Sequence, residues 1–73
     1  MLKGSRNAIL KRLQPISIHG QLSYDVHYSF DDDPDQVHVA RVGPEAVAHG
    51  LQQGDLVRLD FLVGVVTAIT KAG

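Results

Sequence analysis

Four of the eight acidic residues lie in one five-residue segment: Asp31, Asp32, Asp33 and Asp35. Hard cations such as Ca²⁺ are bound by several carboxylate oxygens, so calcium binding is the chemistry that this segment could perform. An EF-hand loop counted from Asp31 would need glycine at its sixth position and glutamate at its twelfth, where the sequence has Gln36 and Val42. We therefore interpret the segment as a solvated turn between two strands.

Histidines are the other candidate metal ligands: His19, His27, His38 and His49. His27 and His38 could approach each other across a hairpin if the strand register allowed it. The chain has no His-x-x-x-His pair on a predicted helix, and no carboxylate lies at ligand spacing from a histidine. We expect no metal site and no cofactor.

Catalytic patterns are missing from the sequence. A serine could act as a nucleophile, but none of the four serines lies in a Gly-x-Ser-x-Gly context. They are Ser5, Ser17, Ser23 and Ser29. Asp25 and Arg41 could face each other on neighbouring strands, where a cross-strand ion pair explains them better than acid–base chemistry. The pattern predicts a protein that is not an enzyme.

Aromatic residues recur at every second or fourth position of one segment, with Tyr24, Tyr28 and Phe30 on one face. Exposed aromatic rings on a small barrel can stack on the bases of single-stranded nucleic acid. Leu22 and Val26 share that face, however, and such alternation is typical of a strand that packs on a core. Exposure of both tyrosine rings would favour nucleic-acid binding by Tyr24 and Tyr28.

The composition indicates one small globular domain over residues 1–73, in which residues 1–8 could form a flexible end. The chain has 73 residues, 44% of them hydrophobic, no cysteine and a net charge of −1. A domain of this size buries only about 60% of the surface that its unfolded chain exposes, so oligomerisation is the remaining route to extra stability. Without a membrane-length apolar run or a signal-peptide pattern, we expect a cytoplasmic protein.

The hydrophobic period is two over most of the chain, which predicts strands. Residues 22–30 and 36–42 are expected to form a hairpin, and residues 57–63 and 65–71 a second hairpin that reverses at Gly64. Residues 44–50 predict a short helix that begins at Pro44 and is capped by Gly50. Residues 8–18 fit a helix or a strand bent at Pro15, and we favour the strand.

These elements predict a mainly β fold. Five strands and one short helix before the last hairpin are most economically arranged as a small, closed or partly closed barrel, because closure removes exposed strand edges. The order of the elements is that of an OB-type barrel, with an SH3-like barrel as the alternative.

Two segments resemble TOBE domains and molbindins: residues 45–57, with Gly50-Leu51 and Gly54-Asp55, and the opening Ser5-Arg6-Asn7 followed by Leu10-Lys11. The resemblance implies an OB fold and binding of a molybdate-like oxyanion, with Ser5, Arg6 and Asn7 as the residues that bind it. The last hairpin departs from the family, because it reads Phe61-Leu62-Val63-Gly64 where the family has Lys-Ala-Thr or Lys-Ala-Ser. Leucine and valine offer the anion no side-chain donor.

The end of that hairpin is apolar on both sides of Gly64. If Leu62, Val63 and Val65 are exposed, they form a natural protein interface, and if they bend across the end of the barrel, they belong to the core. The small size of the chain favours self-association. We therefore expect a non-catalytic interaction module that forms a homo-oligomer or binds a protein partner, with no contact to a membrane.

Overall fold

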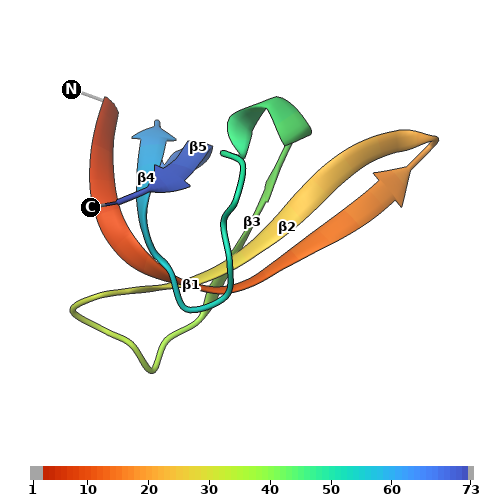
Figure 1. Cartoon of the computed structure of the whole chain (residues 1–73). Coiled ribbons are helices and arrows are strands. Elements are labelled where there is room, and N and C mark those ends of the chain that lie inside the picture. Colours follow the sequence, from red (N-terminus) through yellow and green to blue (C-terminus); the bar gives the residue numbers. More distant parts are fainter. Residues whose placement is uncertain (1–2, 73) are drawn as a thin grey trace.

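The computed structural model describes residues 3–72, which form one antiparallel sheet of five strands and one turn of 3₁₀ helix (Figure 1). The sheet order is β3-β2-β1-β4-β5. The elements are β1 (Lys3–Ile18), β2 (Gln21–Phe30), β3 (His38–Val42), η1 (Pro44–Ala46), β4 (Leu56–Leu62) and β5 (Val65–Lys71). The mainly β fold class and both predicted hairpins are therefore confirmed.

The long strand β1 pairs with two different strands. Residues 3–9 pair with β4 and residues 8–18 pair with β2, and the register of the second ladder shifts between Leu10 and Arg12. The strand is thus confirmed, and Pro15, where a bend was considered, pairs in register with Tyr24. Residues 3–8, considered as a flexible end, lie in β1, and residues 1–2 lie outside the described part.

The predicted helix is shorter than expected. Only Pro44–Ala46 is helical, and Val47 already has extended backbone angles. Val47 forms a parallel bridge with Ile69, and the Ala48 N–H donates to the Ile69 carbonyl at 3.0 Å. Gly50 therefore does not cap the helix. Pro44 and Glu45 do occupy its first turn as predicted.

The core lies on the concave side of the curved sheet. Its buried apolar residues all come from the strands: Ala8, Leu10, Val26, Tyr28, Val42, Val57, Leu59, Val66 and Ile69. Within residues 3–72 no strand ladder joins β3 to β5, so the sheet is not the closed barrel that we considered. The bridge between Val47 and Ile69 connects the two sides instead.

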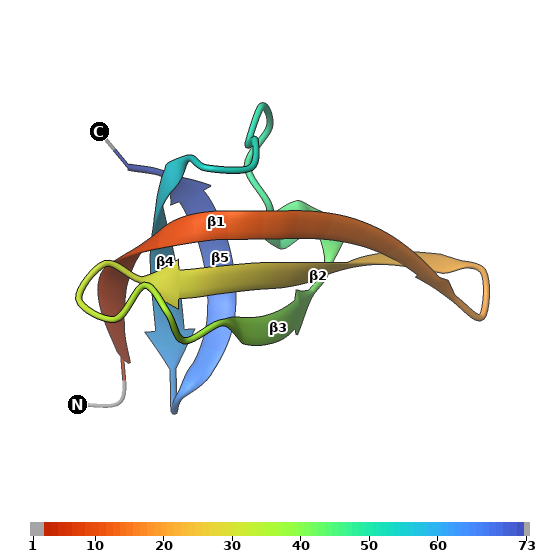
Figure 2. The same cartoon turned by 90° about the horizontal axis from the view of Figure 1, so that it is seen from below.

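The β1–β2 hairpin extends beyond the rest of the sheet (Figure 2). The ladder between β2 and β3 ends at the pair Tyr24–Val42, whereas β1 and β2 remain paired as far as Ile18 and Gln21. Residues 15–23 form a projecting arm with no third strand beside it. No helix among the described residues is long and apolar enough to cross a membrane.

Candidate interaction site

The turn between β4 and β5 consists of two residues with positive φ. Leu62 pairs with Val65, and between them Val63 has φ 52° and Gly64 has φ 76°. Positive φ at both central residues defines a type I′ turn, which favours Asn-Gly, Asp-Gly or Gly-Gly. Glycine satisfies this preference at the second position, whereas valine does not at the first.

The other tight hairpin of the chain provides a direct comparison. His19 and Gly20 join β1 to β2 with φ angles of 51° and 77°, so the two turns have nearly the same φ angles. Histidine is among the residues enriched at positive φ, whereas a β-branched residue there is an outlier. The left-handed conformation costs an L-residue about 1–2 kcal/mol. The β4–β5 turn is therefore strained by its own sequence.

The side chains around this turn are exposed and apolar. Exposure reaches 63% for Val63, 61% for Val65 and 47% for Leu62. Leu62 and Val65 form a cross-strand pair, so their side chains lie on the same face of the hairpin. These three residues, called the tip below, are the site predicted as an interface, and they do not fold across the core.

A shallow depression of about 480 Å³ lies beside the tip. Its lining includes Lys3 and Ser5 of β1 and Arg58 and Asp60 of β4. Arg58 donates to Asp60 Oδ1 at 3.2 Å; the Arg58 side chain is exposed and the Asp60 side chain is partly buried. The depression therefore contains an ion pair and one further cation.

The predicted oxyanion residues do not converge on one face of the sheet. Ser5, Arg6 and Asn7 are consecutive in β1, opposite Asp60, Leu59 and Arg58 of β4. Because successive side chains of a strand point to opposite faces, Arg6 lies on the face of the buried Leu59, away from Ser5 and Asn7. Ser5 alone of the three lines the depression.

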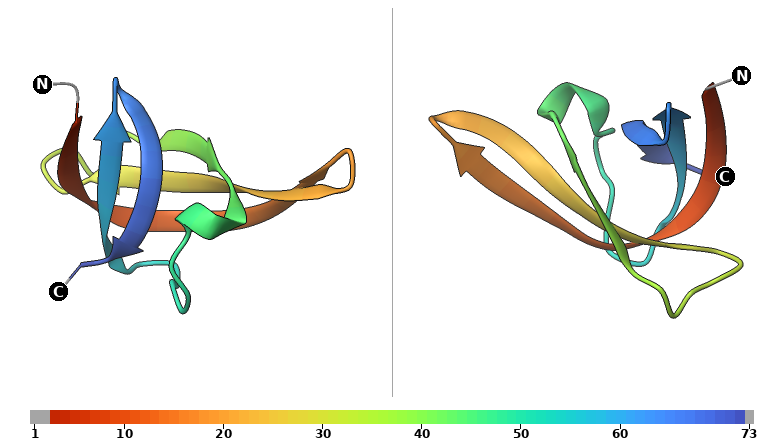
Figure 3. Two further views of the ribbon diagram at one scale, coloured as in Figure 1. Left: turned by 90° about the horizontal axis from the view of Figure 1, so that it is seen from above. Right: turned by 180° about the vertical axis from the view of Figure 1, so that it is seen from behind.

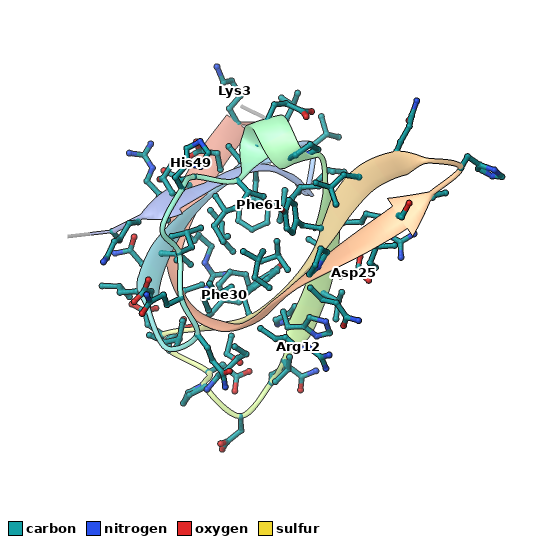
Figure 4. The ribbon with its side chains drawn as sticks, turned by 45° about the vertical axis from the view of Figure 1, so that its right-hand side comes forward. Lys3, Arg12, Asp25, Phe30, His49 and Phe61 are labelled. Carbon is teal, nitrogen blue, oxygen red and sulfur yellow. The ribbon has the colours of Figure 1, made fainter. Side chains whose placement is uncertain are left out.

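Arg6 belongs instead to a group of aromatic residues. Its guanidinium lies 3.6 Å from the centre of the Phe30 ring and donates to Asp32 Oδ1 at 3.3 Å. Phe30 also lies near His38 and Phe61, at ring-centre distances of 5.1 and 6.3 Å. Figure 4 shows Phe30 and Phe61 directed into the space enclosed by the sheet. The cation–π contact connects β1 to the end of β2, and the ion pair connects β1 to the acidic loop that follows.

The two tyrosines differ in exposure. Tyr28 is only 6% exposed and stacks against His38, while Tyr24 is half-buried. Burial raises the pKa of the Tyr28 hydroxyl, an effect that the charge of Arg6 partly opposes. Tyr28 therefore packs in the core and does not offer a ring face for stacking on a base.

The candidate metal ligands remain apart. His38 pairs with Tyr28, and His27 pairs with Val39, so the two histidines occupy opposite faces of the β2–β3 hairpin. Residues Asp31 to Asp35 are exposed in the loop between these strands. No group of three or more potential metal ligands occurs within residues 3–72.

The predicted ion pair between Asp25 and Arg41 is confirmed. The two residues are directly opposite in the β2–β3 ladder, and the guanidinium donates to both carboxylate oxygens at 2.9 and 3.3 Å. The hydrogen bond from Arg41 holds the pKa of the Asp25 carboxyl below its ordinary value, and the same bond raises the pKa of Arg41. Asp25 and Arg41 therefore form a structural ion pair between β2 and β3.

Asp25→Asn is expected to destabilise the protein slightly at pH 7 and to have no effect in strong acid. Because the pKa of Asp25 is lowered in the folded state, the pair stabilises the fold above the unfolded pKa of about 3.9, and this contribution is lost as the pH falls through the lower folded pKa. Urea midpoints of wild type and variant between pH 7 and pH 2 measure the difference. A gap that stays constant over this range would show that Asp25 acts through something other than its charge.

A groove with a mixed polar and apolar lining lies at the base of the arm. It has a volume of about 250 Å³ and separates the arm from the segment around η1. Its main lining residues are Leu13, Tyr24, Pro44, Val47, His49 and Leu51. Leu22, on the same face of β2 as Tyr24, is 46% exposed further out on the arm. We call this set of lining residues the arm groove.

The arm groove was not foreseen from the sequence. Leu22 and Tyr24 continue the alternation of the core residues Val26 and Tyr28, so their spacing predicts burial. Strand length was the signal in the sequence. The strands expected over residues 8–18 and 22–30 are longer than the next strand, which was expected over residues 36–42 and spans His38–Val42 in the structure, so that strand cannot lie along their whole length. An uncovered end of the core face was therefore to be expected.

Comparison of the chain with protein-family models, with curated proteins and with solved structures found no match. The resemblance to TOBE domains and molbindins consequently rests on the residues of its two sequence segments.

Proposed function

We propose that this protein is a non-catalytic interaction module that self-associates through the tip of its β4–β5 hairpin. The observation that carries the proposal is Val63, a β-branched residue at φ 52° whose side chain is 63% exposed. Asparagine at this position would relieve the strain and improve the solubility of the turn. Local strain of this kind concentrates at functional sites, because the fold itself gains nothing from it.

We also propose that the sheet has the topology of an OB-type barrel that is only partly closed, in preference to an SH3-like one. Three features support this: β1 pairs with both β2 and β4, the helical turn lies between β3 and β4, and Val47 bridges to Ile69 across the gap between β3 and β5. In such a barrel the two tight turns extend from the sheet as free loops. The tip is then a surface that can change without disturbing the core.

Val63→Asp is expected to abolish self-association at a protein concentration of about 100 μM, at which weak complexes with micromolar Kd still form. Burying an unpaired carboxylate in an apolar contact is unfavourable, so the variant should sediment as a monomer where the wild type does not. Sedimentation velocity over a concentration series measures this.

Val39→Asp is the matched control, since Val39 is 56% exposed on β3 and is not part of the tip. It should associate like the wild type. A wild-type protein that remains strictly monomeric at the highest concentration would contradict the proposed function, and equal effects of the two variants would contradict the assignment to the tip.

Oxyanion binding is the second candidate function. It is supported by the depression beside the tip, where Ser5 lies with Lys3 and Arg58. Asp60 opposes it, because its carboxylate lines the same depression. Titration calorimetry with molybdate, tungstate and sulfate tests whether an anion binds in the depression despite the Asp60 carboxylate. The absence of heat with all three anions would eliminate oxyanion binding as a function.

A further inference from the structure

The far half of β1 has a strand partner on one side only. Residues 3–9 pair with β4, and beyond them β1 pairs with β2 alone among the described residues. The loop before β4 still covers Leu10, whose N–H donates to the Asp55 carbonyl at 2.9 Å and whose carbonyl accepts from the Gly54 N–H at 2.7 Å. Residues 11–18 then continue into the arm, which extends away from the other strands in both views of Figure 3. Their side away from β2 is called the free edge below.

The strand register shows which backbone groups face the free edge. Ile18 and Gln21 flank the two-residue turn, and the pair that flanks such a turn is hydrogen-bonded. Hydrogen-bonded and non-hydrogen-bonded pairs alternate along an antiparallel ladder, so Ile16 and Gln14 also bond β2. The residues between them direct their backbone groups to the free edge: Leu13, Pro15 and Ser17.

The contacts of Leu10 support this assignment. The register shift next to Leu10 lies in β1, so the alternation can be followed without interruption along β2. Gln21 is hydrogen-bonded to β1, and Tyr28, an odd number of residues later, is therefore not. Its partner Leu10 must then turn its backbone groups away from β2, as its bonds to Gly54 and Asp55 require.

Pro15 is the middle residue of the three at the free edge. Proline has no N–H, so a strand placed beside this edge would find donors at Leu13 and Ser17 and none between them. The hairpin itself loses nothing, because the pair of Pro15 with Tyr24 is not a hydrogen-bonded one. Both Pro15 and Ser17 are exposed, and no backbone hydrogen bond from another segment of residues 3–72 covers them. Proline at such a position protects an edge that would otherwise pair with another chain.

We infer that Pro15 closes the free edge of the arm to a second copy of this chain. The edge is self-complementary about Pro15: in an antiparallel pairing of two copies, Pro15 lies opposite its counterpart, and Leu13 of each copy lies opposite Ser17 of the other. Two residues with N–H groups would exchange two hydrogen bonds at the centre, and proline removes both and places its ring there. This inference goes beyond the proposed function, because it concerns a surface other than the tip and does not depend on association through the tip.

Moving the proline along the edge tests the inference. Val63→Asp is the parent, so that association through the arm is measured without the tip. Pro15→Thr retains every bond to β2 and introduces a residue that favours strands, and at about 100 μM its weight-average mass in sedimentation equilibrium should approach twice that of the parent. Adding Ser17→Pro restores a block at an edge position whose N–H the hairpin does not use, so this variant should return to the mass of the monomer.

Pro34→Thr is the matched control, because Pro34 is an exposed proline in the loop after β2 and not in a strand. Its mass should equal that of the parent. A folded Pro15→Thr protein that stays monomeric overturns the inference, and so does association that Ser17→Pro fails to reverse or that Pro34→Thr reproduces. A wild-type protein without self-association contradicts the proposed function and leaves this comparison of arm variants intact.

Amide hydrogen exchange provides a test that needs no variant at Pro15. In the dilute protein, the N–H groups of Leu13 and Ser17 should exchange at least about tenfold faster than those of Gln14 and Ile16, which bond β2. In associated Pro15→Thr the difference should disappear, because the second copy then accepts the edge hydrogen bonds. Equal protection of all four amides in the dilute wild type would show that the edge is already covered, which overturns the inference.

Discussion

Leu59→Ala is expected to lower the free energy of unfolding by about 3 kcal/mol, the largest effect of any single substitution considered for this chain. Leu59 is completely buried in the middle of β4, opposite Arg6 of β1 and the completely buried Ile69 of β5. Truncation removes the transfer free energy of the side chain and leaves a cavity that the flanking strands cannot close. For a domain of 60–100 residues this corresponds to a melting temperature lower by roughly 12–24 °C.

The small size of the core makes this loss severe. Single cores of fewer than about 80 residues supply only about 3–5 kcal/mol of stability, so a large part of the Leu59→Ala protein should be unfolded at 37 °C. Thermal and urea denaturation followed by circular dichroism measure the change. Leu62→Ala is the matched control: it removes the same atoms from the same strand at a position 47% exposed, and it should cost less than about 1 kcal/mol. Similar losses for both variants would contradict the assigned orientation of β4.

Alternation along the sequence was sufficient to predict β4 and its buried face. Val57 and Leu59 are both completely buried, and Phe61 packs against the core, as their period of two requires. The same period alone would also place Val63 on the buried face, so the alternation left open whether Val63 is exposed or part of the core, and the structure exposes it. The two-residue turn ends the strand at Leu62 and turns Val63 outward, which no count of apolar positions reveals.

The partner strands of β1 could not be predicted from the sequence. Strand propensity identifies residues 8–18 as extended, but pairing is decided by long-range contacts, and β1 changes its main partner from β4 to β2 near the register shift at Leu10. This change also decides the fate of the predicted oxyanion residues. Ser5, Arg6 and Asn7 are adjacent in sequence, and their incorporation into a strand directs Arg6 to the Phe30 ring and away from the other two.

Ser29 shows a further limit of sequence reasoning. The alternation from Leu22 to Phe30 assigns Ser29 to the polar, solvent-facing side, yet it is completely buried and its hydroxyl has no hydrogen-bond partner among the described residues. Its neighbour in the ladder is Ile9 of β1. Both faces of β2 are buried at this point because other segments cover the sheet there. The alternation of residues within one strand carries no information about such coverage.

Val63→Asn is expected to change folding and assembly in opposite directions. Asparagine adopts positive φ readily, and Asn-Gly is the preferred sequence of a type I′ turn, so the monomer should gain about 1 kcal/mol of stability. The melting temperature at low concentration should rise by roughly 4–8 °C. In the assembly, an amide replaces an apolar side chain in an apolar contact, so the Kd of self-association should rise about tenfold or more.

His19→Asn is the matched control, because it makes the same replacement at the corresponding position of the β1–β2 turn, where φ is 51°. Histidine already tolerates that conformation and is not part of the tip, so stability should change little and association should not change. Denaturation of dilute protein and sedimentation of concentrated protein give the two readouts. A loss of stability in Val63→Asn would show that Val63 supports the fold, and unchanged association would show that the tip is not an interface. Higher stability of dilute Val63→Asn, together with weaker self-association of the concentrated variant, would show that the strain at Val63 serves assembly rather than folding.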